Sequence, residues 1–125
     1  MGFDLSGIKP ISEEGMAFRN NVWWWRPLWE YICETCPDVI TLEQAHAGTY
    51  NDGIEITGRQ SKKIFLRLQE LKENGRTSKH EVEHQAKLLQ QKEDNPEDFY
   101  EYPFSEENVD KFAHFCKESG GFEIW

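Results

Sequence analysis

A stretch of fourteen residues, FRNNVWWWRPLWEY from Phe18 to Tyr31, constrains the fold of this 125-residue chain more than any other. Four of the five tryptophans fall inside it: Trp23, Trp24, Trp25 and Trp29. Each buried indole removes roughly 150–250 Å² from water, at about 25 cal/mol per Å². No other stretch of the chain concentrates as much apolar area. The hydrophobic core is therefore expected to assemble here.

Pro27 divides this stretch into two expected parts. A proline ring disfavours the helical region for the residue before it, here Arg26, while its own φ suits the first position of a helix. The sequence thus predicts an extended segment over Val22–Arg26 and a helix over Pro27–Cys36, ended by Pro37. Alternation along an extended segment places Trp23 and Trp25 on one side and Trp24 on the other. Either both sides are covered by the fold, or one of them is a binding face.

The rest of the chain predicts short strands and several helices. Strands are expected at Gly2–Ser6, Ile54–Ile56 and Phe122–Trp125, with the two terminal strands pairing into a small sheet. Helices are expected as a brief turn from Ser12 towards Arg19, and over 42–47, 58–74, 79–92 and 106–119. The predicted fold is α+β, a mostly helical single domain over residues 1–125, with a small sheet formed by the terminal strands.

The two middle helices are expected to form an antiparallel hairpin. Gly75 provides the left-handed residue after the first of them, and Ser78 with Glu81 forms a capping box for the second. On that second helix the apolar positions recur at helical spacing and predict the inward face: Val82, Ala86 and Leu89.

The charge of the chain is unevenly distributed. The net charge is −9, which disfavours nonspecific binding to nucleic acid. Residues 58–92 are basic while both ends are acidic, so the segments are expected to neutralise each other; an acidic surface that mimics nucleic acid is the alternative. No apolar run is long enough to span a membrane, and the start MGFDLSG lacks the features of a signal peptide. The sequence therefore predicts a cytoplasmic protein without a membrane partner.

The motif His80-Glu81-Val82-Glu83-His84 matches the HExxH pattern of zinc peptidases, in which two histidines hold the metal and the glutamate polarises water. A zinc hydrolase is thus one functional alternative. If Val82 and Leu89 face inward, however, both histidines point to solvent, which favours an ordinary exposed face.

Three cysteines offer a second metal alternative. Cys33 and Cys36 form a CxxC, but at the end of the expected helix, where the dipole does not favour thiolates as it does in thioredoxin-like sites. A zinc site from Cys33, Cys36, His46 and Cys116 would be a closed set of four ligands, though its spacing matches no standard finger. Buried packing thiols are the simpler interpretation. The sequence indicates no catalytic residue, metal or cofactor, and the enzyme question stays open, leaning towards no.

The candidate binding residues surround the tryptophans. If the turn at Asn51-Asp52-Gly53 folds back on them, a polar and aromatic pocket or surface results. The candidate set is Asn20, Asn21, Trp23, Trp24, Trp25, Arg26, Trp29, Asn51 and Asp52.

Several segments of the chain resemble a family of small uncharacterised proteins from phages and bacterial genomes: MGFDLSG, FRNNVWWWRPLW, YNDG, YPFSEENVDKFAHF and GGFEIW. Some of those relatives are associated with cysteine pairs in the middle, but residues 58–98 here contain no cysteine, so no such module carries over. The resemblance implies a phage or mobile-element setting.

Three functional hypotheses follow from the residues and this setting. The first is a non-catalytic accessory factor that engages a host or phage protein, such as a component of a defence system that it inhibits, through a Trp-rich surface. The second is a sponge or sensor for a small ligand or nucleotide, bound beside the tryptophans. The third is the zinc hydrolase.

Overall fold

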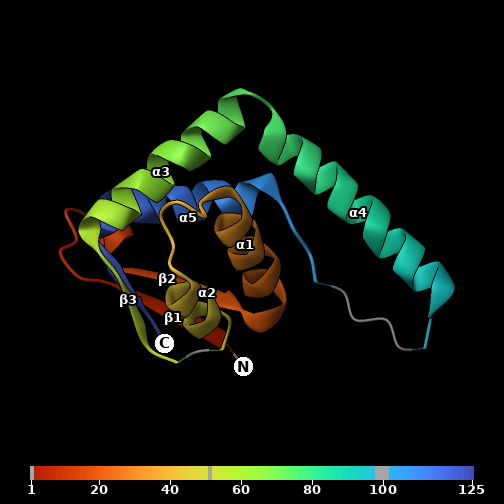
Figure 1. Ribbon diagram of the computed structural model, residues 1–125, viewed down its shortest axis with the longest axis horizontal. Coiled ribbons are helices and arrows are strands. Elements are labelled where there is room, and N and C mark those ends of the chain that lie inside the picture. The colour runs from red at the N-terminus through yellow and green to blue at the C-terminus, as the bar shows by residue number, and fades with distance from the viewer. Residues whose placement is uncertain (1, 51, 98–101) are drawn as a thin grey trace.

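Both ends of the chain enter one four-stranded antiparallel sheet (Figure 1). The computed structural model describes residues 2–50, 52–97 and 102–125. The strands are β1 (Gly2–Gly7), β2 (Ala17–Asn21), β3 (Ile54–Ile56) and β4 (Phe122–Ile124), in the order β2-β1-β4-β3. The helices are α1 (Val22–Thr35), α2 (Leu42–Thr49), α3 (Gly58–Glu73), α4 (Arg76–Asp94) and α5 (Glu106–Ser119), with a short 3₁₀ turn, η1 (Glu13–Gly15). The predicted mostly helical α+β fold is confirmed.

The predicted pairing of the terminal strands is also confirmed, with Leu5 opposite Ile124 in the β1–β4 ladder. Residues Ala17–Asn21 form strand β2, whereas the sequence predicted a helical turn reaching Arg19, so that prediction is wrong. In β2 the half-buried residues are Phe18 and Asn20, two positions apart, as a strand requires. The alternation was obscured because one of its two inward positions carries an asparagine.

Helix α1 begins five residues earlier than predicted, so the expected extended segment Val22–Arg26 is wrong. The side chain of Asn21 accepts a hydrogen bond from the Trp24 backbone N–H at 3.0 Å, which caps the helix. Pro27 therefore lies inside the helix, where it removes one backbone hydrogen bond. That local cost is offset because a helix places Trp25, Leu28 and Trp29 on one buried face.

The tryptophans of this face form the centre of the core. The rings of Trp25 and Trp29 stack with centroids 5.3 Å apart, and Trp25 also stacks on Phe3 of β1 at 5.5 Å. Helix α2 covers both indoles, since Trp25 Nε1 donates to the Gly48 carbonyl at 2.8 Å and Trp29 Nε1 to the Ala45 carbonyl at 3.0 Å. A Cβ on Gly48 would lie 2.5 Å from the Trp29 ring, so only glycine permits this approach.

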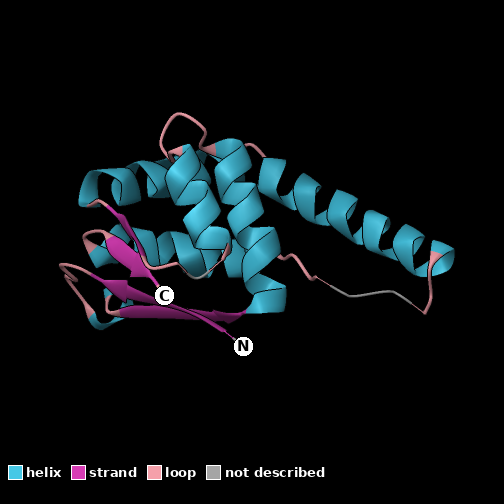
Figure 2. Cartoon of the chain, turned by 60° about the horizontal axis from the view of Figure 1, so that its bottom comes forward, coloured by secondary structure: helices cyan, strands magenta, loops and turns pink. Residues whose placement is uncertain are grey.

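Helices α3 and α4 do not form the expected antiparallel hairpin. They make a wide V, and α4 runs away from the rest of the molecule (Figures 1 and 2). Gly75 has the predicted left-handed conformation, with φ 80°, but α4 begins directly after it rather than at a Ser78 cap. The Ser78 hydroxyl instead donates to the Glu106 carboxylate of α5 at 3.2 Å.

The face that α4 turns towards the body is the reverse of the prediction. Val82 and Leu89 are 64% and 65% exposed, whereas Thr77 is buried and His80 is half-buried. The Thr77 hydroxyl hydrogen-bonds the Tyr31 hydroxyl at 2.9 Å, so a polar pair lies where apolar residues were expected. Helical periodicity identified a stripe, but it did not reveal that this stripe faces solvent.

Within the described residues, no helix combines the length and apolar character that crossing a bilayer requires.

The cap of α1 gives a first prediction. Replacing Asn21 with alanine leaves the Trp24 N–H without its acceptor, and the free energy of unfolding should fall by about 1 kcal/mol. Asn21→Asp retains an acceptor and should stay close to the wild type. Urea unfolding followed by tryptophan fluorescence measures both variants, and equal losses in the two would contradict the capping role.

Candidate functional site

The structure separates the four clustered tryptophans into two pairs. Trp25 and Trp29 are 0% and 1% exposed, so neither is available to a partner or ligand at the surface. Trp23 is 39% exposed and packs against the Tyr102 ring with centroids 4.9 Å apart, and Trp24 is half-buried. Of these four, the two in the first turn of α1 reach the surface, and Trp125 at the end of the chain is exposed as well, at 52%.

The polar candidates near this turn have structural contacts of their own. Asn20 and Asn108 exchange side-chain hydrogen bonds of 3.2 and 3.0 Å, which join β2 to α5. Asn21 is the exposed cap of α1, and Arg26 is exposed one turn further along the helix.

A hollow of about 260 Å³ lies beside Trp24. It is lined by Asn20, Trp24, Ser105, Glu107, Asn108 and Lys111. We call these residues, together with Trp23, Asn21 and Arg26 from the start of α1, the indole surface; Arg26 shares a helix face with Trp23 and not with Trp24.

Of the last two candidates, Asp52 does not extend this surface. Asn51 lies outside the described residues. Asp52 is exposed, and its backbone N–H donates to the Ala47 carbonyl at the end of α2 at 3.1 Å. The next residue, Gly53, lies against the ring of Trp125. This turn is therefore tied to α2 and to the C-terminus.

The side chains of the HEVEH motif hold α4 to the body. The His80 ring packs between Tyr31 and Phe104, with both centroid distances 4.5 Å. His84 Nε2 contacts the Tyr102 carbonyl at 2.5 Å, and the Glu81 carboxylate accepts the Glu106 backbone N–H at 3.0 Å. The expectation that both histidines point to solvent is wrong, because they lie on the packed face.

Burial affects the protonation of His80. It lowers the pKa of His80, opposed by the nearby Glu34 carboxylate, and His84 adds to the lowering. A neutral imidazole is therefore favoured between the two aromatic rings. A hollow of about 370 Å³ separates α1 from α4 here, with Glu30 and Glu34 on one wall and His80 and His84 on the other.

The four residues of the second zinc hypothesis do not appear among the metal-ligating groups that the described residues bring together. His46 is exposed and packs on Tyr50, whereas Cys36 and Cys116 are buried in the core. Burial raises the pKa of all three thiols, that of Cys33 to about 12. The cysteines thus have the character of packing residues.

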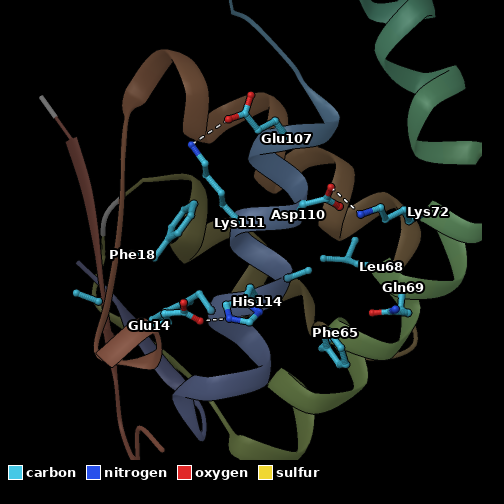
Figure 3. A pocket seen from close by; sticks show the side chains of 13 residues that line it. Glu14, Phe18, Phe65, Leu68, Gln69, Lys72, Glu107, Asp110, Lys111 and His114 are labelled. Carbon is cyan, nitrogen blue, oxygen red and sulfur yellow. Dashed lines mark hydrogen bonds and ion pairs between the residues drawn. The ribbon is translucent and has the colours of Figure 1, made fainter. Parts of the chain in front are cut away.

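A larger groove runs along the outer face of α5, between α3 and the η1–β2 segment (Figure 3). Its volume is about 610 Å³, within the range of ligand pockets. The apolar lining includes Phe18, Phe65, Leu68 and Phe115. Sequence reasoning missed this groove because its walls come from segments far apart in the chain.

Charged pairs border the groove (Figure 3). Lys72 bonds Asp110 at 3.0 Å, Lys111 lies 3.3 Å from Glu107, and His114 contacts Glu14. The Asp110 carboxylate raises the pKa of Lys72, so that lysine stays cationic. The two lysines are therefore already paired with acids, and an anionic ligand would compete with those acids.

No protein-family model matches the chain, and neither the curated proteins nor the solved structures contain a significant match. The resemblance to small phage and bacterial proteins consequently stays a prediction.

The raised thiol pKa values give a second prediction. For Cys33, a pKa of about 12 instead of 9.0 lowers the thiolate fraction about a thousandfold at neutral pH. An aromatic disulfide reagent should therefore label the native protein far more slowly than the denatured protein, in which all three thiols react. Rapid labelling of the native chain, located by peptide mass spectrometry, would show that these thiols are not protected.

Proposed function

We propose that the chain is a non-catalytic binding protein that engages another protein through the indole surface. The resemblance implies a phage or mobile-element setting, and in that setting the partner is a bacterial host protein, with inhibition of a defence system as one such role.

The observation that carries this proposal is the exposure of Trp23, whose neighbour in the chain, Trp24, lines the hollow. Tryptophan, tyrosine and arginine are the residue types that dominate the energetics of protein interfaces. Here Trp23 and Arg26 lie one turn apart on α1, and the Tyr102 ring packs against Trp23. Because Trp23 is held against Tyr102, little side-chain entropy is lost when a partner covers it.

The shape of the surface favours a protein over a small molecule. The hollow beside Trp24 measures about 260 Å³, below the roughly 300–1,000 Å³ of most small-molecule sites. It is large enough for a side chain that a partner inserts. The buried positions of Trp25 and Trp29 also remove half of the indoles from the proposed small-ligand pocket.

Helix α4 adds a second apolar feature to the surface of the molecule. Its outward stripe contains Val82 and Leu89, both about two-thirds exposed, on a helix that projects from the body (Figure 2). The charge of −9 opposes association of two copies, so the expected partner is a different protein with basic groups around its contact area.

A capture experiment with matched variants tests this proposal. Immobilised wild-type protein and the variants Trp23→Ala, Arg26→Ala and Leu42→Ala are compared on the same bacterial lysate. Leu42 is 92% exposed on α2 and serves as the control. We expect at least one lysate protein that both the wild type and the control retain. Trp23→Ala should retain at least tenfold less of that protein, which is the loss expected when a hot-spot residue is truncated.

The melting temperature of each variant shows that it is folded. The proposal is overturned if Trp23→Ala and Arg26→Ala retain the same proteins as Leu42→Ala, in the same amounts.

A further inference from the structure

Three potential metal ligands converge at one end of the α5 groove. They are Glu14 of η1 and His114 and Glu118 of α5, and one ligand atom of each lies within 4.8 Å of the other two. Glu14 and His114 also line the groove (Figure 3). Within the described part of the chain this is the one set of three or more such residues in that arrangement.

We propose that Glu14, His114 and Glu118 bind a divalent cation of the zinc type. The site lies apart from the indole surface and does not depend on the proposed function. An imidazole nitrogen with two carboxylate oxygens is a mixed N/O donor set. Such a set suits Zn²⁺ and Co²⁺, whereas Mg²⁺ and Ca²⁺ prefer ligands that are all oxygen. Three protein ligands leave one position of a tetrahedral ion for water or an exogenous ligand.

The spacing of the ligands fits this role. His114 and Glu118 are four residues apart on α5, so their side chains leave the same face of the helix on consecutive turns. Glu14 comes from η1 and contacts His114 Nε2. The imidazole thus already has a carboxylate partner at the atom that would bind the metal.

The backbone fixes η1 against α5 at this point. The Ile11 N–H donates to the Glu118 carbonyl at 2.9 Å, and the Lys9 N–H donates to the Ser119 carbonyl at 3.0 Å. Gly15 is buried, and a Cβ there would lie 2.1 Å from the Glu118 carbonyl oxygen. Because two rigid elements carry the ligands, a metal would need only side-chain adjustment, which lowers the entropic cost of binding.

The local charge balance also favours a cation. Among the described residues, neither Glu14 nor Glu118 forms an ion pair with a lysine or arginine. The nearest basic residue along α5, Lys117, lies over the Phe65 ring at 5.6 Å, and Lys111 is paired with Glu107. A divalent ion would neutralise two carboxylates in a chain of net charge −9.

Zn²⁺ titration by isothermal calorimetry tests the site, using chelator-treated protein and the variants His114→Ala, Glu14→Gln and His46→Ala. His46 is an exposed histidine on α2 and serves as the matched control. We expect one equivalent of Zn²⁺ to bind to the wild type and to His46→Ala. The dissociation constant should rise at least tenfold in His114→Ala and in Glu14→Gln.

Co²⁺ absorption distinguishes this site from the cysteines. The wild type should develop d–d bands without the charge-transfer band of a thiolate ligand, and His114→Ala should lose them. The proposal is overturned if a thiolate band appears, if His114→Ala binds Zn²⁺ as tightly as the wild type, or if the wild type binds none. In that last case Glu14 and His114 form a simple ion pair.

Discussion

The stacked pair of Trp25 and Trp29 is the interaction on which the rest of the structure depends. The two rings lie one helical turn apart, so their contact exists only if the chain is helical through Pro27. Their indole N–H groups bond carbonyls of α2, which satisfies buried donors and also fixes where α2 lies. Trp25 extends the stack to Phe3, which joins this helical layer to the sheet. Burial at this one place outweighs the backbone hydrogen bond lost at Pro27.

Features encoded within three or four residues could be predicted from the sequence. The predicted helix starts at residues 42 and 58 and the left-handed Gly75 are confirmed, because they depend only on the local capping hydrogen bonds of Thr41 and Thr57 and on φ. The start of α1 could not be predicted, because the local preference set by Pro27 opposes the tertiary packing of Trp25 and the packing is stronger. The face of α4 failed for a related reason: periodicity does not show that Val82 faces solvent while Thr77 faces a buried tyrosine.

The candidate sites likewise combine features that a few neighbouring residues encode with features that depend on the tertiary fold. The first turn of α1 is a candidate that composition alone suggests, but the sequence did not reveal which indoles are buried, since this depends on the helix phase. The α5 groove joins Glu14 to residues of α3 and α5 that lie 51 to 101 positions further along the chain, from Phe65 to Phe115, and no local pattern brings those segments together. One local signal was present in the sequence: His114 and Glu118 have the helical spacing of paired metal ligands. This spacing indicates a metal site only once the fold brings Glu14 of η1 beside these two residues.

The uneven charge of the chain bears on both the proposed metal site and the indole surface. The basic middle does neutralise acids elsewhere, since Arg67 makes two hydrogen bonds with Asp38 and Lys72 pairs with Asp110. Among the described residues, Glu14 at the end of the groove pairs with no lysine or arginine, and it contacts His114 instead. Strand β2 follows η1 directly and ends at Asn21, the cap from which Trp23 and Trp24 project. The proposed metal ligand Glu14 and the indole surface thus lie at the two ends of one short stretch of chain, and backbone hydrogen bonds to α5 already fix where that stretch begins.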